Sequence, residues 1–285
     1  MNIFYMIFGE KLVHHMQAYL SIRTFQKQLG SDDHIFVMTT HPEYYKNSGV
    51  EAIPITDEKI VEWKGEKDFF WRVKIKAIEY MSVHYPDDHL MYLDTDTFLY
   101  GSLNALKERL NKGCGMMHLN EGHPSTMKTK TLRMWKQIGG HTYGGISLGQ
   151  HHSMYNAGVV AIPKSKLADV SNLALTICDG MLADNAERIV IEQYSLSIAL
   201  YEKTNMKVAE DLIGHYWGNK ADWEQLVSDL MCKAYMKNQT VEEELAGLDI
   251  ELLKQTPIYV DRSSRYGQLC RLADKLFPIR KKRCV

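Results

Sequence analysis

The amino-acid sequence predicts an α/β fold, in which a mostly parallel central sheet carries helices on both faces. Apolar runs typical of buried strands lie at residues 2–9 (NIFYMIFG) and 34–40 (HIFVMTT), and a helical pattern at residues 14–30 separates them. The order strand, helix, strand favours parallel pairing through a right-handed crossover. With 285 residues, of which 45% are hydrophobic, the chain is long enough to bury a large core.

Later segments continue this alternation. Residues 50–55 (VEAIPI) predict a short strand, and residues 67–86 predict a helix that Pro86 ends. The run HLMYL at 89–93 is too apolar for an exposed face, which places it at the centre of the sheet. Residues 111–153 lack periodicity and predict long loops around a site. The remaining expected elements are a strand at 156–163, a helix at 185–204, a strand at 206–210, a loop at 214–223 and helices within 223–255.

Composition excludes several classes of protein. The formal net charge is -1, so no global field attracts nucleic acid. The cysteines number five and have no C-x-x-C spacing, which argues against a disulfide framework or a zinc site. No stretch reaches the ~20 apolar residues of a spanning helix. We expect a soluble cytoplasmic protein.

Two carboxylates follow the central strand in the stretch MYLDTDTFLY. If the chain is still extended there, Asp94 and Asp96 lie on the same side, because side chains alternate with period two. Carboxylates this close repel each other unless a cation lies between them. Oxygen ligands suit Mg²⁺ or Mn²⁺, which keep positions open for substrate phosphates. The pair therefore predicts a divalent metal site at the carboxyl end of a central strand, where open α/β sheets bind their ligands.

More than one chemistry uses such a pair. The letters DTDT resemble the D-x-D-x-T motif of haloacid-dehalogenase phosphatases, whose first aspartate is a nucleophile. That motif is expected near the start of a chain, whereas 93 residues precede Asp94. A sugar nucleotidyltransferase is a further alternative, although FGEKLVHH lacks its Gly-rich basic loop. A non-catalytic carbohydrate-binding protein of the same fold also stays open.

The order of the motifs resembles that of one enzyme family. YLDTDT, YNAGVVAIP, the EQ pair at 192–193 and HYWGNK at 215–220 follow one another as in the glycogenin-like and galactosyltransferase-like members of glycosyltransferase family eight. The resemblance covers residues 1–223 and implies a GT-A fold. It also implies a nucleotide-sugar donor, with uridine diphosphate as the expected carrier, a divalent metal and retaining transfer of the sugar. We expect the acceptor to be a glycan or a lipid-linked precursor. The implied domains are a catalytic domain at 1–225, with a nucleotide-binding half (1–98) and an acceptor and metal half (99–225), and a helical extension at 226–285.

The resemblance implies a role for each matching residue. Asp94, Asp96 and His215 would hold Mn²⁺ or Mg²⁺, and an imidazole beside two carboxylates favours Mn²⁺ over Ca²⁺. The residues expected to contact the donor are Arg72, Lys76, Thr95, Gly218 and Lys220, and those expected near the reacting carbon are Asn156, Glu192 and Gln193.

Some of these positions depart from the family pattern or have simpler explanations. One residue instead of two separates Gly218 from Lys220, and Glu192 stands where the family has Asp. His215 could be an ordinary hydrogen-bonded histidine, and Arg72 and Lys76 could form a solvated helix face. Two tryptophans that flank the expected metal loop, Trp217 and Trp223, are further candidates for contact with donor or acceptor.

The C-terminal segment has its own charge. Residues 262–283 contain eight Lys or Arg and one acid, and Leu269, Leu272 and Leu276 recur at helical spacing. Such a helix can lie in a membrane interface and be attracted to anionic lipid, which makes a peripheral contact with the inner leaflet one expectation. The alternative is a helix packed on the domain, with Leu269 and Leu276 in the core.

Overall fold

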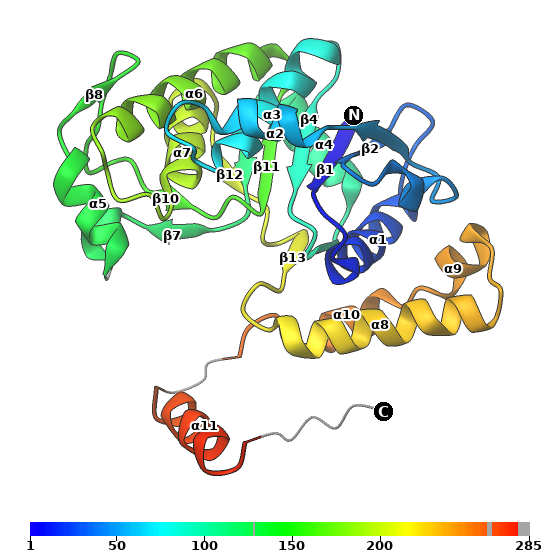
Figure 1. Ribbon diagram of the computed structural model, residues 1–285. Helices are drawn as coiled ribbons and strands as arrows, with labels where there is room; N and C mark the ends of the chain where they lie inside the picture. Colours follow the sequence, from blue (N-terminus) through cyan, green and yellow to red (C-terminus); the bar gives the residue numbers. More distant parts are fainter. Residues whose placement is uncertain (128, 261–263, 279–285) are drawn as a thin grey trace.

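A computed structural model describes residues 1–127, 129–260 and 264–278, and it shows a mixed α/β fold around a seven-stranded sheet (Figure 1). The strand order is β12-β6-β11-β4-β1-β2-β3. All neighbours pair in parallel except β11, which runs antiparallel to both β4 and β6. The predicted fold class, a mostly parallel sheet between helices, is therefore confirmed. The strands of this sheet are β1 (Asn2–Ile7), β2 (His34–Thr39), β3 (Glu51–Pro54), β4 (Leu90–Leu93), β6 (Met116–Met117), β11 (Val159–Ile162) and β12 (Lys207–Val208).

Helices cover both faces of the sheet because its central strands are apolar on both sides. In β1, Ile3 and Tyr5 belong to the core cluster that α1 and α4 close, whereas Phe4 belongs to the cluster under α3, α6 and α7. The strand β4 alternates in the same way. The helices of the described chain are α1 (Leu12–Gln26), α2 (Asp57–Lys64), α3 (Arg72–His84), α4 (Leu103–Asn111), α5 (Lys130–Ile138), α6 (Leu167–Ala183), α7 (Ile191–Lys203), α8 (Lys220–Met236), α9 (Val241–Gly247), α10 (Ile250–Gln255) and α11 (Ser264–Leu276).

The prediction of long loops over residues 111–153 was wrong in part. This segment contains β6, β7 (Asn120–Gly122), α5, β8 (Thr142–Tyr143) and β9 (Ile146–Ser147). In α5 the side chains of Met134 and Ile138 are buried one turn apart, and the partly buried Leu132 and Trp135 widen this apolar face. The helical spacing of Leu132, Trp135 and Ile138 was therefore present in the sequence, but it extends over a single short helix between irregular segments. The first helix was expected to reach Gly30 but ends at Gln26, after which the Gln28 side chain binds the Gly101 carbonyl and the Leu103 N–H.

Two short ribbons extend the fold beyond the carboxyl end of β4. The strand β13 (Ile213–His215), in a segment expected to be partly loop, pairs antiparallel with β5 (Thr97–Leu99), and this register sets His215 opposite Thr97. The strand β10 (Met154–Tyr155) pairs with β7. These ribbons bring residues from distant parts of the sequence to the turn after β4.

The C-terminal helices divide into a packed group and one exposed helix. Helix α8 begins inside the expected catalytic domain, and its residues Trp223 and Val227 share a core cluster with Leu20 of α1 and Leu253 of α10. Figure 1 shows α11 set apart from the sheet. Its residues Leu269 and Leu276 are 64% and 65% exposed, so the alternative that placed them in the core is wrong.

Part of the basic segment, residues 262–263 and 279–283, lies outside the described residues. Among the described helices, none has the length and apolar character needed to span a bilayer.

Candidate metal centre

The two aspartates lie in a tight turn where β4 ends. The Asp94 N–H donates to the Gly158 carbonyl (2.8 Å), and the Thr97 hydroxyl donates to the Asp94 carbonyl (2.8 Å). The Asp96 carbonyl accepts from the Tyr216 N–H (3.0 Å), which links the turn to the residue after β13. These backbone bonds fix the turn that carries both carboxylates.

His215 meets the aspartates through the pairing of β13 with β5. Its Nε2 lies 3.2 Å from Asp96 Oδ1, and both side chains are buried. One ligand atom from each of Asp94, Asp96 and His215 lies within 4.8 Å of the other two. The structure thus brings together the three predicted metal ligands.

Hydrogen bonds identify the tautomer of His215. Asn156 Oδ1 accepts from the Gly158 N–H (3.0 Å), which identifies this atom as the amide oxygen. Nδ1 of His215 lies 3.0 Å from the same oxygen and must donate to it. A neutral ring with its proton on Nδ1 turns a lone pair of Nε2 toward the oxygen of Asp96. A positive charge is needed between these two atoms, and either a proton or a metal ion supplies it, so the residues fit a divalent cation.

Lysines neutralise both aspartates. Lys220 Nζ lies 2.9 Å from Asp96 Oδ2, although the lysine side chain is 51% exposed. Burial disfavours the ionised form of Asp96, but the hydrogen bond and charge of His215, with the charge of Lys220, outweigh burial and hold the pKa of Asp96 well below 3.8. Asp96 is therefore a carboxylate at neutral pH, as a metal ligand must be.

Lys74, which was not among the predicted residues, is the α3 residue that contacts the site. Its buried Nζ lies 3.1 Å from Asp94 Oδ1 and donates to the Ala157 carbonyl (3.2 Å). The Tyr92 hydroxyl also donates to Asp94 Oδ1 (2.6 Å), which leaves Oδ2 as the less engaged oxygen. The signal that could have revealed Lys74 is its place among the buried residues of α3, beside Val73 and Ala77.

Two of the three residues expected near the reacting carbon, Asn156 and Gln193, are joined through one carboxylate. Asn156, next to His215, donates through Nδ2 to Glu121 Oε1 (3.0 Å). Gln193 donates through Nε2 to Glu121 Oε2 (2.9 Å) and accepts from the Ala157 N–H (3.3 Å). Glu121, an exposed residue of β7, therefore binds both amides. It lay in the segment interpreted as loops, and nothing in its local sequence marks it.

Glu192 is buried in the first turn of α7. Its Oε2 has no hydrogen-bond partner within the described chain. Burial raises the pKa of Glu192 to about 7, the Lys74 charge lowers it in part, and the Asp94 charge raises it further. Near neutral pH this carboxyl therefore exists as a mixture of acid and carboxylate.

Other predicted donor contacts lie elsewhere or are partly covered. Arg72 binds Asp179 of α6 through two nitrogens (2.7 and 3.0 Å), and Lys76 pairs with Glu79. The hydroxyl of Thr95 lies 3.4 Å from Gln17 Oε1. The structure therefore leaves Arg72 and Lys76 paired outside the aspartate cluster.

The loop after β13 is in contact with the C-terminal extension. A Cβ on Gly218 would lie 2.2 Å from the Tyr259 ring, so the C-terminal segment covers this glycine. Trp217 is half-exposed and packs edge-on against Tyr259. Trp223 is fully buried and stacks on Tyr216 at 4.1 Å, so it cannot contact a ligand as the sequence suggested.

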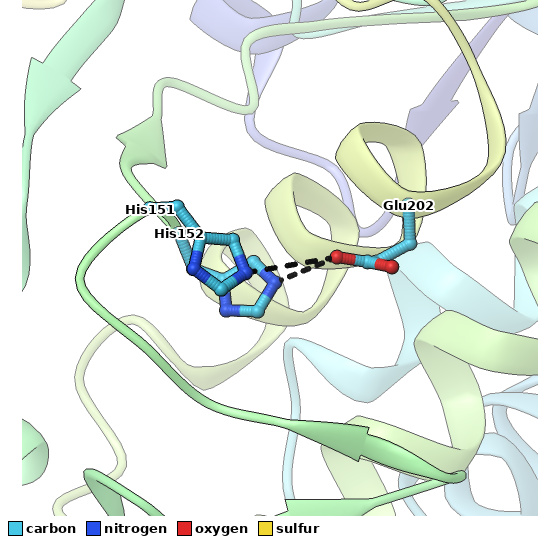
Figure 2. A group of neighbouring side chains, drawn as sticks. All are labelled: His151, His152 and Glu202. Carbon is cyan, nitrogen blue, oxygen red and sulfur yellow. Dashed lines mark hydrogen bonds and ion pairs between the residues drawn. The ribbon is translucent and has the colours of Figure 1, made fainter.

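A second group of potential metal ligands contains His151, His152 and Glu202 (Figure 2). His152 Nδ1 accepts from the Gly149 N–H (3.1 Å), so its proton lies on Nε2 and is donated to Glu202 Oε1 (2.9 Å). This tautomer turns an N–H, not a lone pair, toward the group, which does not fit a metal ligand. The contact instead joins the loop at 149–152 to α7.

Comparisons with known proteins give limited information. No family model matches the sequence, and no curated protein matches it. Among solved structures, the chain is similar to an active-site mutant of LgtC, with a TM-score of 0.47 and 14% identity over 73% of this chain and 72% of that chain. The function must therefore be inferred from the geometry of the site itself.

Proposed function

We propose that the protein is a glycosyltransferase that moves a sugar from a nucleotide-diphosphate sugar to a glycan or lipid-linked acceptor and depends on a divalent ion, Mn²⁺ or Mg²⁺. The observation that carries the proposal is the convergence of Asp94, Asp96 and His215 at the carboxyl end of β4. Two lysines beside this group supply the positive charge that a diphosphate requires.

Each charged residue has a role in this proposal. The bound ion would be held by Asp94, Asp96 and His215 and would neutralise charge on the departing diphosphate. Lys220 can release Asp96 to the ion and turn its exposed Nζ to a phosphate oxygen. Lys74 is buried and keeps Asp94 oriented. The donor contacts of Thr95 and Gly218 belong to the proposal, as does uridine as the base.

Retention of configuration is the proposed stereochemistry. The side chains of Asn156 and Gln193 are both engaged in hydrogen bonds, which leaves Glu192 as the ionisable group of this region with an unpaired oxygen. In a retaining transfer the leaving phosphate takes the proton of the acceptor, and Glu192 tunes the charge near the reacting carbon. In an inverting transfer Glu192 would be the base.

The competing functions make different demands on Asp94. A phosphatase of haloacid-dehalogenase type needs one oxygen of Asp94 free to attack, and this would have to be Oδ2, because Tyr92 and Lys74 hold Oδ1. A nucleotidyltransferase would form a pyrophosphate bond from a nucleoside triphosphate. A carbohydrate-binding protein would bind without turnover. The products formed, or their absence, therefore distinguish these functions.

The acceptor and the place of action are also proposals. The exposed leucines of α11, with Arg271 and Lys275 on the same helix, suit peripheral contact with an anionic membrane surface from the cytoplasmic side. A lipid-linked acceptor would be reached there.

Ligand-dependent thermal stability tests the class of activity. We expect nucleoside diphosphates and their sugars to raise the melting temperature only together with Mn²⁺, since a ligand that binds the folded state stabilises it by mass action. Sugar-dependent release of nucleoside diphosphate then measures turnover. Asp96→Ala should abolish both effects, whereas Asp229→Ala, at an exposed residue of α8, should leave them unchanged. Full turnover by Asp96→Ala would refute the proposed centre.

A further inference from the structure

We propose that Glu121 is a positioning residue that fixes the metal-binding tautomer of His215 through the side chain of Asn156. The inference rests on the proposed function, because it concerns the ion that His215 would bind. Glu121 lies on β7, outside every motif of the sequence, and reaches the site through hydrogen bonds to Asn156 and Gln193.

The carboxylate of Glu121 is matched to two amide donors. Its Oε1 accepts from Asn156 Nδ2 at 3.0 Å, and its Oε2 accepts from Gln193 Nε2 at 2.9 Å. A carboxylate has no donor of its own, so both amides must turn their NH₂ groups toward it. Hydrogen bonds to an ionised acceptor are about twice as strong as those between neutral groups.

The orientation of Asn156 then determines that of His215. With Nδ2 held by Glu121, Oδ1 of Asn156 faces the imidazole and accepts from Nδ1 at 3.0 Å. The proton is therefore kept on Nδ1, and the lone pair of Nε2 faces the aspartates. The three side chains form a relay from β7, through the segment between β10 and β11, to β13, in which the outer carboxylate orients the inner ligand.

Asn156 cannot easily compensate for the loss of Glu121 by turning its amide. The Gly158 N–H donates to Oδ1 at 3.0 Å and would face an NH₂ group after such a turn. Glutamine at position 121 offers one oxygen to two amide donors, so one NH₂ must face another. The substitution Glu121→Gln therefore disturbs the relay without changing the size of the side chain.

The test exchanges the carboxylate and the amide between positions 121 and 156. The affinity for Mn²⁺ alone is measured by calorimetric titration. We expect Glu121→Gln to weaken Mn²⁺ binding about ten-fold, the lower end of the range for lost outer-shell partners. Combining it with Asn156→Asp should restore binding. The new carboxylate at position 156 would accept hydrogen bonds from His215 and Gly158. The glutamine at position 121 would donate its NH₂ group to this carboxylate, and its carbonyl oxygen would accept from Gln193. A control, Glu66→Gln in the exposed loop after α2, removes the same charge away from these contacts and should bind like wild type.

Melting temperatures of the metal-free variants separate positioning from folding. A positioning role predicts weaker Mn²⁺ binding in a variant whose melting temperature equals that of wild type. Wild-type affinity in Glu121→Gln, or no recovery in the double variant, would overturn the role of Glu121 and leave the metal centre standing. Failure of the wild-type protein to bind Mn²⁺ would overturn the metal centre and the relay together.

Discussion

The raised pKa of Glu192 predicts a pH-dependent stability that a single substitution removes. The ordinary pKa is 4.5, and burial raises the pKa of Glu192 to about 7 in the folded protein. Between these values the folded state holds a proton that the unfolded chain has lost, so the free energy of unfolding falls as the pH rises. A difference of about 2.5 in pKa corresponds to about 3 kcal/mol at 25 °C, since one pKa unit is worth about 1.4 kcal/mol.

A second buried group acts in the opposite direction. Burial lowers the pKa of His118 to about 4 from 6.5, so the folded state binds fewer protons than the unfolded chain in that window and its stability rises with pH. Asp96, whose pKa lies below 3.8, does not change the free energy of unfolding with pH above about pH 5. The wild-type curve alone therefore mixes two opposing slopes, and the effect of Glu192 must be measured as a difference.

Urea unfolding of wild type and Glu192→Gln between pH 4.5 and 8, with a chelator present, provides that difference. The variant keeps the shape of the side chain and does not titrate. We expect its stability relative to wild type to increase by about 3 kcal/mol from the acid to the alkaline end. Parallel stability curves for the two proteins would refute the buried, partly neutral state assigned to Glu192.

Further substitutions probe the packing of the site and its surroundings. Gly158→Ala places a Cβ 2.2 Å from Cε1 of His215, so we expect Mn²⁺ binding in a titration to weaken at least about ten-fold. The control is Gly247→Ala, where the added Cβ meets open space, and equal Mn²⁺ affinities of the two variants would contradict the close contact. Trp223→Ala should lower the free energy of unfolding by about 3–5 kcal/mol in urea, whereas Trp71→Ala, at a half-exposed residue, should cost far less; similar losses would argue against the buried position. In vesicle sedimentation the full chain should bind anionic lipid and a chain ending at residue 261 should not; equal binding would exclude a membrane role for the tail.

The sequence predicted best those features that depend on neighbouring residues. The apolar run at 89–93 determined both the position of β4 and the site of Asp94 and Asp96, because the motif follows the strand directly. His215 lies 119 residues from Asp96, and only the order of motifs connected the two. Helix α6 was not predicted at all, although Leu173 and Ile177 are among its many buried residues.

The residues that were missed or wrongly assigned depend on contacts with distant parts of the chain. Lys74 is a lysine within a buried helix face, and its partner lies at the end of another strand. Glu121 is exposed and contacts residues 35 and 72 positions away. Trp223 was expected beside a ligand because it follows the metal loop, but α8 begins at Lys220 and turns the indole into the core. In each case tertiary packing decided the outcome.

The pairing of β13 with β5 has a consequence for synthesis of the chain. The aspartates leave the ribosome long before His215, and α8, which anchors the segment after β13, follows later still. A nascent polypeptide that stops short of this helix would possess two of the three donors and lack the imidazole. If the cluster binds Mn²⁺ as proposed, high-affinity binding should appear only after translation has passed β13 and α8, so the ion would report that folding is complete and would not nucleate it.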